Sequence, residues 1–365
     1  MRSGAFDAER PVNQIHFGGG TPTFLDDGQL ARLMDTLSSH FSFRDDDGGD
    51  YAIEIDPRTV DRKRLVTLRS LGFNRISLGV QDLNPLVQKA VNRVQPYEMI
   101  RDTIAWAREI GFHSINVDLI CGLPLQTETS LLHSLDRLLP LKPDRISMYN
   151  YAHLPARFKV QRQIDESALP PAAEKIRMVS RGGSLLQDHG YRFIGMDHFA
   201  LEDDEMARAQ RDGKLHRNFQ GYTLHGDTDL VGLGVSAISD IGDLYLQNEK
   251  GLDQWKARLH DDQLPIWKGY RLERDDMIRR DLIMRLLCDL ELDIGAFESR
   301  WKLDFDDYFA DALPAWRNFD REGLADREGR RLKITDQGRL VSRALVQVFD
   351  AHIQATEPAK YSRVL

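Results

Sequence analysis

The chain has 365 residues, of which 41% are hydrophobic and 29% charged, and its formal net charge is −8. This composition is typical of a globular protein, and the length predicts one large domain and one smaller domain. The negative charge disfavours a nucleic-acid partner, and no run approaches the roughly 20 apolar residues of a membrane span. With two cysteines, Cys121 and Cys288, and no signal-peptide pattern after Met1, we expect a cytoplasmic protein without disulfides.

Strand and helix patterns alternate through the first half of the chain. Runs of apolar residues at helical spacing separate the expected strands, which span 14–17, 51–55, 75–80, 114–120, 145–149 and 191–196. The expected helix over 172–188 contains Gly182 and Gly183, which cost about 1 kcal/mol each and weaken the case for one continuous helix. Repeated βα units imply parallel strands, either in a barrel or in an open sheet.

Polar residues at the strand ends favour the barrel. An open doubly wound sheet gathers its ligand contacts at one switch point, whereas a barrel spreads them around one rim. Here they follow five strands, at 18–21, at Glu54 with Asp56, at Gln81 with Asp82, at Asp118, and at Asn150 with Tyr151. We therefore predict an α/β fold with an incomplete parallel βα barrel.

Three consecutive glycines, Gly18 to Gly20, follow the first expected strand and precede Thr21 and Pro22. A backbone without Cβ atoms can approach a ligand closely and exposes its N–H groups to it. A flexible strand-to-helix loop is the alternative interpretation of this run.

The C-terminal part has a different pattern. Helical stripes over 278–290 and 305–313 precede a hairpin over 323–335 and an amphipathic helix over 340–349, an order similar to a winged-helix module. Acidic flanking residues disfavour DNA binding, so we expect a lid or packing domain over the barrel mouth. The predicted domains are 1–270, a partial barrel with a substrate-covering extension, and 271–365, a mainly helical domain.

Several blocks, in one order, resemble the oxygen-independent coproporphyrinogen III oxidases, the coproporphyrinogen dehydrogenases of the radical S-adenosylmethionine (SAM) superfamily. They are GGGTPT (18–23), IEIDP (53–57), GFNRISLGVQD (72–82), NVDLI (116–120), GLP (122–124), NYAHLP (150–155), GMDHF (195–199), LHRNFQGYT (215–223) and GVSAIS (234–239). The resemblance covers nearly the whole chain and implies a partial βα barrel with a C-terminal helical domain.

The resemblance also implies the chemistry. A [4Fe-4S] cluster reduces SAM, and the resulting 5′-deoxyadenosyl radical abstracts a hydrogen from a propionate of coproporphyrinogen III. Loss of carbon dioxide and one electron leaves a vinyl group, and reaction at two propionates gives protoporphyrinogen IX. The implied partners are coproporphyrinogen III, an electron donor and an electron acceptor, and we expect a monomer that binds neither nucleic acid nor membrane.

By the same resemblance, two SAM molecules bind side by side at Gly19, Gly20, Thr21, Glu54, Gln81, Arg93, Asp118, Ala152 and Ile238. Glycine amides suit the methionine end, carboxylates accept from ammonium or ribose groups, and an arginine fork matches a carboxylate. Ala152 and Ile238 are the adenosine contacts. The alternatives are a helix cap for Asp118 and a solvated charge for Arg93. No catalytic residue is assigned.

Charge complementarity suggests three residues that bind the four substrate propionates, namely Arg157, Arg162 and Arg217. No family contact matches these positions. No metal site is predicted from histidines: we expect His16 to pack beside the barrel, and His153, His198 and His216 lack the spacing of a zinc site.

One feature departs from the family. Its CxxxCxxC signature supplies three thiolates to the cluster, and no such motif occurs in the 365 residues. We therefore expect that the first βα unit is missing, through a truncated gene model or product, and that this chain is inactive alone. A haem-trafficking relative and a non-catalytic remnant that retains SAM or tetrapyrrole affinity are the alternative functions.

Overall fold

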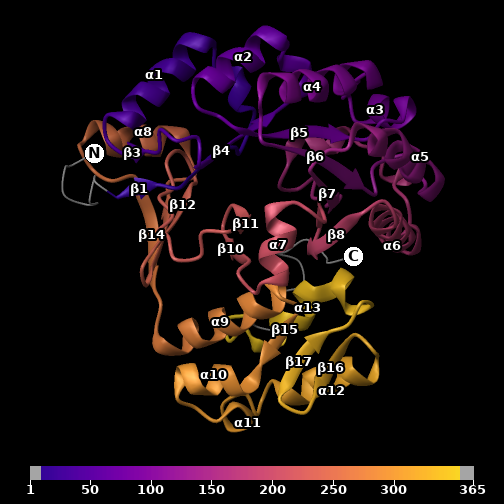
Figure 1. Ribbon diagram of the computed structural model, residues 1–365, viewed down its shortest axis with the longest axis vertical. Helices are drawn as coiled ribbons and strands as arrows, with labels where there is room; N and C mark the ends of the chain where they lie inside the picture. The colour runs from indigo at the N-terminus through magenta and orange to yellow at the C-terminus, as the bar shows by residue number, and fades with distance from the viewer. Residues whose placement is uncertain (1–9, 354–365) are drawn as a thin grey trace. The chain divides into compact units, whose positions relative to one another are not determined.

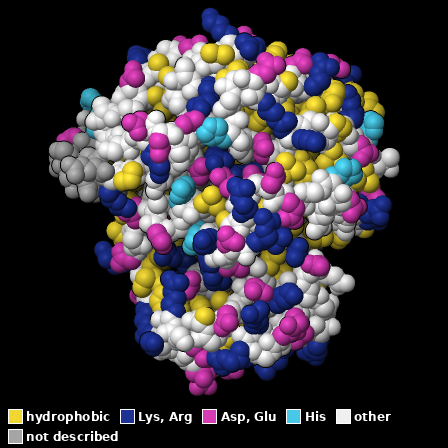
Figure 2. All heavy atoms as spheres, viewed as in Figure 1, with side chains coloured by type: hydrophobic (Ala, Val, Ile, Leu, Met, Phe, Trp, Pro, Cys, Tyr) yellow, Lys and Arg dark blue, Asp and Glu magenta, His cyan; other side chains and the backbone are white. Residues whose placement is uncertain are grey.

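The computed structural model describes residues 10–353, which divide into two compact units, one ending at Asp204 and the other beginning at Glu205. Residues 205–270, which the sequence assigned to the first domain, thus lie in the second unit. Neither unit contains, within the described residues, a helix long and apolar enough to cross a membrane. On the face shown in Figure 2, cationic and anionic side chains are interspersed.

The first unit contains a seven-stranded sheet. Its strand order is β2 (Gln14–Phe17), β4 (Asp50–Ile55), β5 (Arg75–Gln81), β6 (Ser114–Cys121), β7 (Arg145–Asn150), β9 (His198–Leu201) and β8 (Tyr191–Gly195). The first five strands are parallel, as predicted. Two short strands, β1 (Pro11–Val12) and β3 (Ser42–Phe43), form a separate parallel pair.

The last part of the sheet differs from the prediction of a wholly parallel series. Strand β9 lies between β7 and β8 and is antiparallel to both. Gly195 and Met196 have φ values of 155° and 54°, a combination that reverses the chain between β8 and β9. Because a hairpin strand does not need a crossover helix, the βα alternation gave no sign of it.

Six helices cover one face of this sheet and form an arc outside the strands in Figure 1. They are α1 (Asp27–Ser38), α2 (Arg62–Ser70), α3 (Pro85–Ala90), α4 (Tyr97–Ile110), α5 (Glu128–Leu138) and α6 (Ala172–Asp188). Side chains of Ile53, Leu78 and Val117 on the central strands are buried completely. Since successive strand residues point to opposite faces, polar residues between them belong to the other face.

Helix α6 is continuous despite its two glycines. A Cβ at Gly182 would lie 3.2 Å from Met148 Cε, and one at Gly183 would lie 3.3 Å from the Phe199 ring. These glycines therefore lie where the helix packs closest to β7 and β9, and the packing offsets their low helix propensity.

The second unit combines small sheets with helices. Its first part contains α7 (Glu205–Arg211), the hairpin β10 (His216–Asn218) and β11 (Gly221–Thr223), the sheet β12 (Ile238–Ile241), β13 (Leu244–Asn248) and β14 (Ile266–Arg271), and α8 (Leu252–His260). Its second part contains α9 (Arg274–Cys288), α10 (Ile294–Trp301), α11 (Phe305–Tyr308), α12 (Leu313–Arg321) and α13 (Ser342–Val346). There the predicted hairpin, β16 (Ala325–Glu328) and β17 (Arg331–Ile334), is joined by β15 (Glu291–Asp293).

Candidate functional site

A row of polar side chains crosses the face of the seven-stranded sheet opposite the buried aliphatic residues. We call Glu54, Ser77, Asn116, Asp118 and Ser147 the polar row. Cross-strand pairing joins them, because Glu54 pairs with Ser77, Ser77 with Asn116, and Asp118 with Ser147. The row therefore runs across four adjacent strands, β4 to β7.

Asp118 lies at the centre of a hydrogen-bond network. The Ser77 hydroxyl donates to Asp118 Oδ2 at 2.6 Å, and Asn116 Nδ2 donates to Oδ1 at 2.8 Å. Ser147 in turn donates to Asn116 Oδ1 at 3.2 Å and orients that amide. Burial raises the pKa of Asp118, and the nearby Glu54 carboxylate adds to the rise, whereas the hydrogen bonds oppose it. A cationic ligand beside this carboxylate would favour its ionised form.

Glu54 lies beside the glycine loop that follows β2. His16 Nε2 is 3.1 Å from Glu54 Oε1, and an ionised carboxylate can only accept, so the imidazole donates. The Glu54 side chain remains 40% exposed and is accessible to a ligand. The expectation that His16 packs beside the barrel missed this contact.

The glycine loop is open to solvent. A Cβ at Gly19 or Gly20 would meet no atom within 4 Å, and Gly19 has a φ of 85°, which favours glycine. Thr21 precedes a 3₁₀ turn, and its side chain does not cap that turn. Backbone groups of this loop are therefore free to approach a bound molecule.

Arg93 and Gln81 meet over Gly79. Arg93 pairs with Asp56 at 3.1 Å and donates from Nη2 to the Gly79 carbonyl at 2.8 Å. A Cβ on Gly79 would lie 2.9 Å from Gln81 Nε2 and 3.0 Å from Arg93 Nη2, so a larger residue would displace both. Burial lowers the pKa of Arg93, and its Nε has no hydrogen-bond partner within residues 10–353.

Two features of this cluster bear on the sequence predictions. Gln81 has a φ of 68°, a strained conformation for a residue with a side chain and one that is frequent at functional sites. Asp56 is buried and binds both Arg58 and Arg93, whereas Glu54 lies in the polar row. Strand alternation alone would place residues 54 and 56 on one face, but β4 ends at Ile55, so Asp56 caps the following 3₁₀ turn and binds the two arginines instead.

Three predicted residues lie in the loop after β7. The Ala152 carbonyl accepts a hydrogen bond from Gln161 Nε2 at 3.0 Å. Arg157 is exposed beside the Phe158 ring, and the exposed Arg162 donates from Nε to the Pro155 carbonyl at 3.1 Å. Neither arginine is in contact with the polar row through a hydrogen bond or ion pair.

The remaining two predicted residues belong to the second unit. Ile238 begins β12, and Arg217 lies on β10 with its guanidinium 5.7 Å from the centre of the Tyr222 ring. Arg217 Nε is buried without a hydrogen-bond partner in the described chain. The first unit alone thus brings together Glu54, Gln81, Arg93, Asp118 and the glycine loop.

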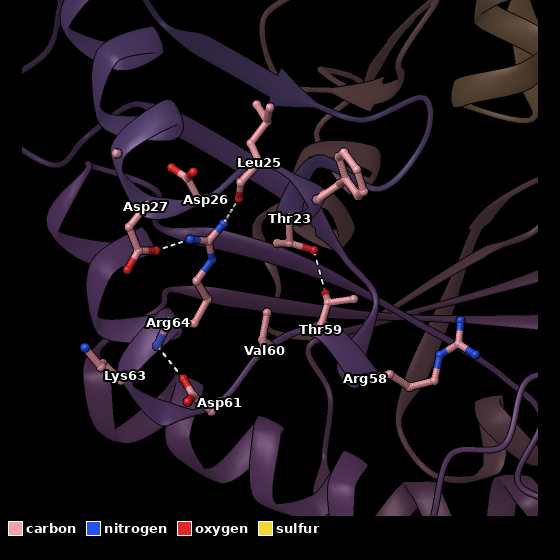
Figure 3. Close-up of a pocket in the computed structure, with 12 residues that line it drawn as sticks. Thr23, Leu25, Asp26, Asp27, Arg58, Thr59, Val60, Asp61, Lys63 and Arg64 are labelled. Atoms are coloured by element: carbon pink, nitrogen blue, oxygen red, sulfur yellow. Dashed lines mark hydrogen bonds and ion pairs between the residues drawn. The ribbon is translucent and has the colours of Figure 1, made fainter.

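A separate cavity of about 740 Å³ lies between the loops that precede α1 and α2. Figure 3 shows Thr23 and Thr59 pointing toward one another, and Arg64 reaching from α2 to Asp27 and the Leu25 carbonyl. None of the predicted SAM contacts lines this cavity. Because none of them lines it, this cavity is not the predicted site.

The two cysteines do not fit an iron–sulfur cluster. Cys121 lies on β6 in the first unit and Cys288 on α9 in the second, and both thiols are buried. Burial raises the pKa of each thiol to about 12, which disfavours the thiolate that iron requires. Between residues 10 and 353, no group of three or more His, Cys, Asp or Glu side chains has a metal-binding arrangement.

Comparisons with known proteins agree with this fold. Residues 3–138 match the family model of the Radical SAM superfamily, and residues 272–341 match that of the HemN C-terminal domain. The chain is 49% identical to the oxygen-independent coproporphyrinogen III oxidase of Pseudomonas aeruginosa, over 98% of this chain and 78% of that protein. It is 47% identical to the Escherichia coli protein of the same name, with the same shares covered.

A solved structure decides the family. The Escherichia coli coproporphyrinogen III oxidase HemN, described as a radical SAM enzyme, matches with a TM-score of 0.92 and 48% identity, over 95% of this chain and 79% of that one. The chain belongs to the oxygen-independent coproporphyrinogen III oxidases. The resemblance seen in the sequence is thereby confirmed, and so is the partial α/β fold with a mainly helical C-terminal domain.

Sequence reasoning missed the residues that surround the predicted carboxylates. Ser77, Asn116 and Ser147 were not singled out, although their alternation with aliphatic residues on β5, β6 and β7 is visible in the sequence. Tyr149 and His198 were also unassigned, and their rings meet edge to face at 5.8 Å on the same side of the sheet. Burial raises the pKa of Tyr149, and the Asp118 carboxylate adds to the rise, so the phenol stays protonated.

Proposed function

We propose that this chain takes part in the oxygen-independent conversion of coproporphyrinogen III to protoporphyrinogen IX and binds SAM over the polar row. Membership of the oxidase family supports the haem-biosynthetic role and the oxidoreductase class. The observation that carries the proposed site is the convergence of the open glycine loop, Glu54 and the Asp118 network on one sheet face. We retain 1–270 and 271–365 as the proposed functional division of the chain.

The charges of this face suit the charges of SAM. Glu54 and Asp118 would attract the ammonium and sulfonium groups or accept from ribose hydroxyls, and Gly19 to Thr21 would approach the methionine end. Arg93 would hold the methionine carboxylate through its guanidinium group, whose buried Nε has no hydrogen-bond partner within residues 10–353. When bound and reduced, SAM supplies the radical that abstracts a propionate hydrogen. The protein residues bind and orient it.

For the substrate, we propose that arginines offset an otherwise acidic protein. Coproporphyrinogen III carries four propionates, and the chain has a net charge of −8, so local positive charge must favour binding. Arg157 and Arg162 present exposed guanidinium groups in the loop after β7, and Arg217 has a buried Nε without a partner in the described residues. Ala152 and Ile238 are the proposed adenosine contacts.

The thiols favour a second candidate for this chain, which is binding of SAM or tetrapyrrole without redox turnover. A [4Fe-4S] cluster belongs to the family chemistry, but the two buried cysteines do not fit it, and we assign it no step here.

A fluorescence titration distinguishes the oxidase from a haem-trafficking relative by the tetrapyrrole that the chain binds more tightly. Coproporphyrin III, with the same four carboxylates, should bind more tightly than haem, and the reverse order would favour the haem-trafficking alternative.

Reconstitution with iron and sulfide under anaerobic conditions tests the redox capacity. We expect no [4Fe-4S]⁺ EPR signal after reduction and no 5′-deoxyadenosine from SAM, because two thiols cannot supply the usual three ligands. The Escherichia coli relative, treated in parallel, serves as the positive control. A cluster signal with SAM cleavage by the 365-residue chain would contradict this expectation and support full oxidase activity.

A further inference from the structure

His16 and Glu54 form an isolated pair at the β2 side of the polar row. His16 pairs with Ala52 across the two parallel strands, and Glu54 is two residues further along β4 on the same face. The His16 imidazole donates to the Glu54 carboxylate at 3.1 Å. Within residues 10–353, no other hydrogen bond to the Glu54 side chain is present, so His16 alone fixes one oxygen and leaves the second accessible.

Gly18 leaves the space that this pair occupies. A Cβ at Gly18 would lie 2.5 Å from Glu54 Oε1 and 2.6 Å from His16 Nε2. Both distances are far below van der Waals contact, so any side chain at this position would push the carboxylate away. Gly18 therefore differs from Gly19 and Gly20, around which no atom lies within 4 Å.

We propose that His16 and Gly18 are positioning residues that fix the Glu54 carboxylate for a cationic or hydroxyl-bearing part of SAM. This inference rests on the proposed function. A partly exposed glutamate otherwise samples several rotamers, and a ligand must then restrict them at a cost in affinity. The His16 donor on β2 restricts Glu54 before SAM binds, and the absence of a Cβ at Gly18 leaves the room that the paired carboxylate occupies.

Isothermal titration of SAM into the 365-residue chain tests this role without any need for turnover. His16→Ala should weaken SAM binding by about tenfold, the usual effect of losing one hydrogen bond to a charged group. His16→Gln, which keeps a donor, should recover part of the affinity, and Gly18→Ala should lose a similar factor to His16→Ala. His40→Ala, at the exposed end of α1, is the matched histidine control and should bind as wild type does.

A double-mutant cycle separates positioning from general destabilisation. If His16 acts through Glu54, His16→Ala should have little further effect in a Glu54→Ala background. Independent effects of the two substitutions, or wild-type affinity in a folded His16→Ala variant, would overturn the inference while leaving the proposed function intact. A folded wild-type chain that does not bind SAM would overturn the proposed function, and the inference with it.

Discussion

The two faces of the seven-stranded sheet have opposite chemistry on the same strands. On β5, Leu78 is completely buried against the helix side, whereas its neighbour Ser77 donates to Asp118 on the other face. The side chains on the helix face are aliphatic and need no hydrogen-bond partner, whereas the carboxylates on the other face need several such partners. The difference teaches that one strand can supply stability through one face and a ligand site through the other. Substitutions on the helix face should mainly lower stability, and those on the other face should mainly weaken ligand binding.

Truncation on the helix face should have the largest effect on folding. Leu78→Ala removes a fully buried side chain and should lower the free energy of unfolding by about 2–5 kcal/mol. Denaturant titration followed by circular dichroism measures this loss. A change below about 1 kcal/mol would show that the helix layer does not pack on β5 as described.

Truncation of the adjacent residue should have a smaller effect on folding and a clear effect on the ligand. Ser77→Ala removes one donor to Asp118 and should cost about 1 kcal/mol of stability. SAM affinity, measured by calorimetry, should fall several-fold because the Asp118 carboxylate loses its orientation. Equal stability losses in Ser77→Ala and Leu78→Ala would remove the distinction between the faces.

Asp118 and Asp56 should change the stability of the fold with pH in opposite directions. We expect these effects to be smaller than those of the two substitutions above. The raised pKa of Asp118 means that its contribution to stability is present below the unfolded carboxyl pKa of about 4 and is lost as pH rises through the folded value. Hydrogen bonds from Arg58 and the charge of Arg93 outweigh burial and lower the pKa of Asp56, whose contribution is present above about 4 and is lost on acidification through the folded value.

Denaturant titrations between pH 3 and 7 compare these two groups. Relative to wild type, Asp118→Asn should gain stability as pH rises, and Asp56→Asn should be less stable at neutral pH with a deficit that shrinks on acidification. The same sign of pH dependence in both variants would contradict the assigned environments.

Local patterns in the sequence predicted much of this arrangement. The alternation of strand and helix patterns predicted the five parallel strands of the first unit. The sequence patterns did not predict the antiparallel strand β9, because the turn at Gly195 and Met196, and not a hydrophobic period, determines its pairing. The contact between His16 and Glu54 joins residues 38 positions apart, and no local pattern encodes it.

The clustering of the residues proposed to bind SAM was predictable only in part. The family resemblance supplied nine residues, and five features of the first unit, the glycine loop with Glu54, Gln81, Arg93 and Asp118, lie together on its sheet. Gly79 leaves room for the side chains of Arg93 and Gln81. This role depends on tertiary packing, so the position of Gly79 in a strand did not predict it. Ile238 and Arg217 lie in the second unit, and their part in the site stays a prediction.

Calorimetric titration of SAM into wild type, Asp118→Asn and Arg93→Ala tests the central claim most directly. We expect saturable binding to wild type and about tenfold weaker binding to each variant, because each loses a charged hydrogen bond to the ligand. Tyr97→Phe, on the surface of α4 where its ring packs against Arg137, should bind as wild type does. Wild-type affinity in both folded variants, or no binding by the wild-type chain, would contradict the account of the polar row as a SAM site.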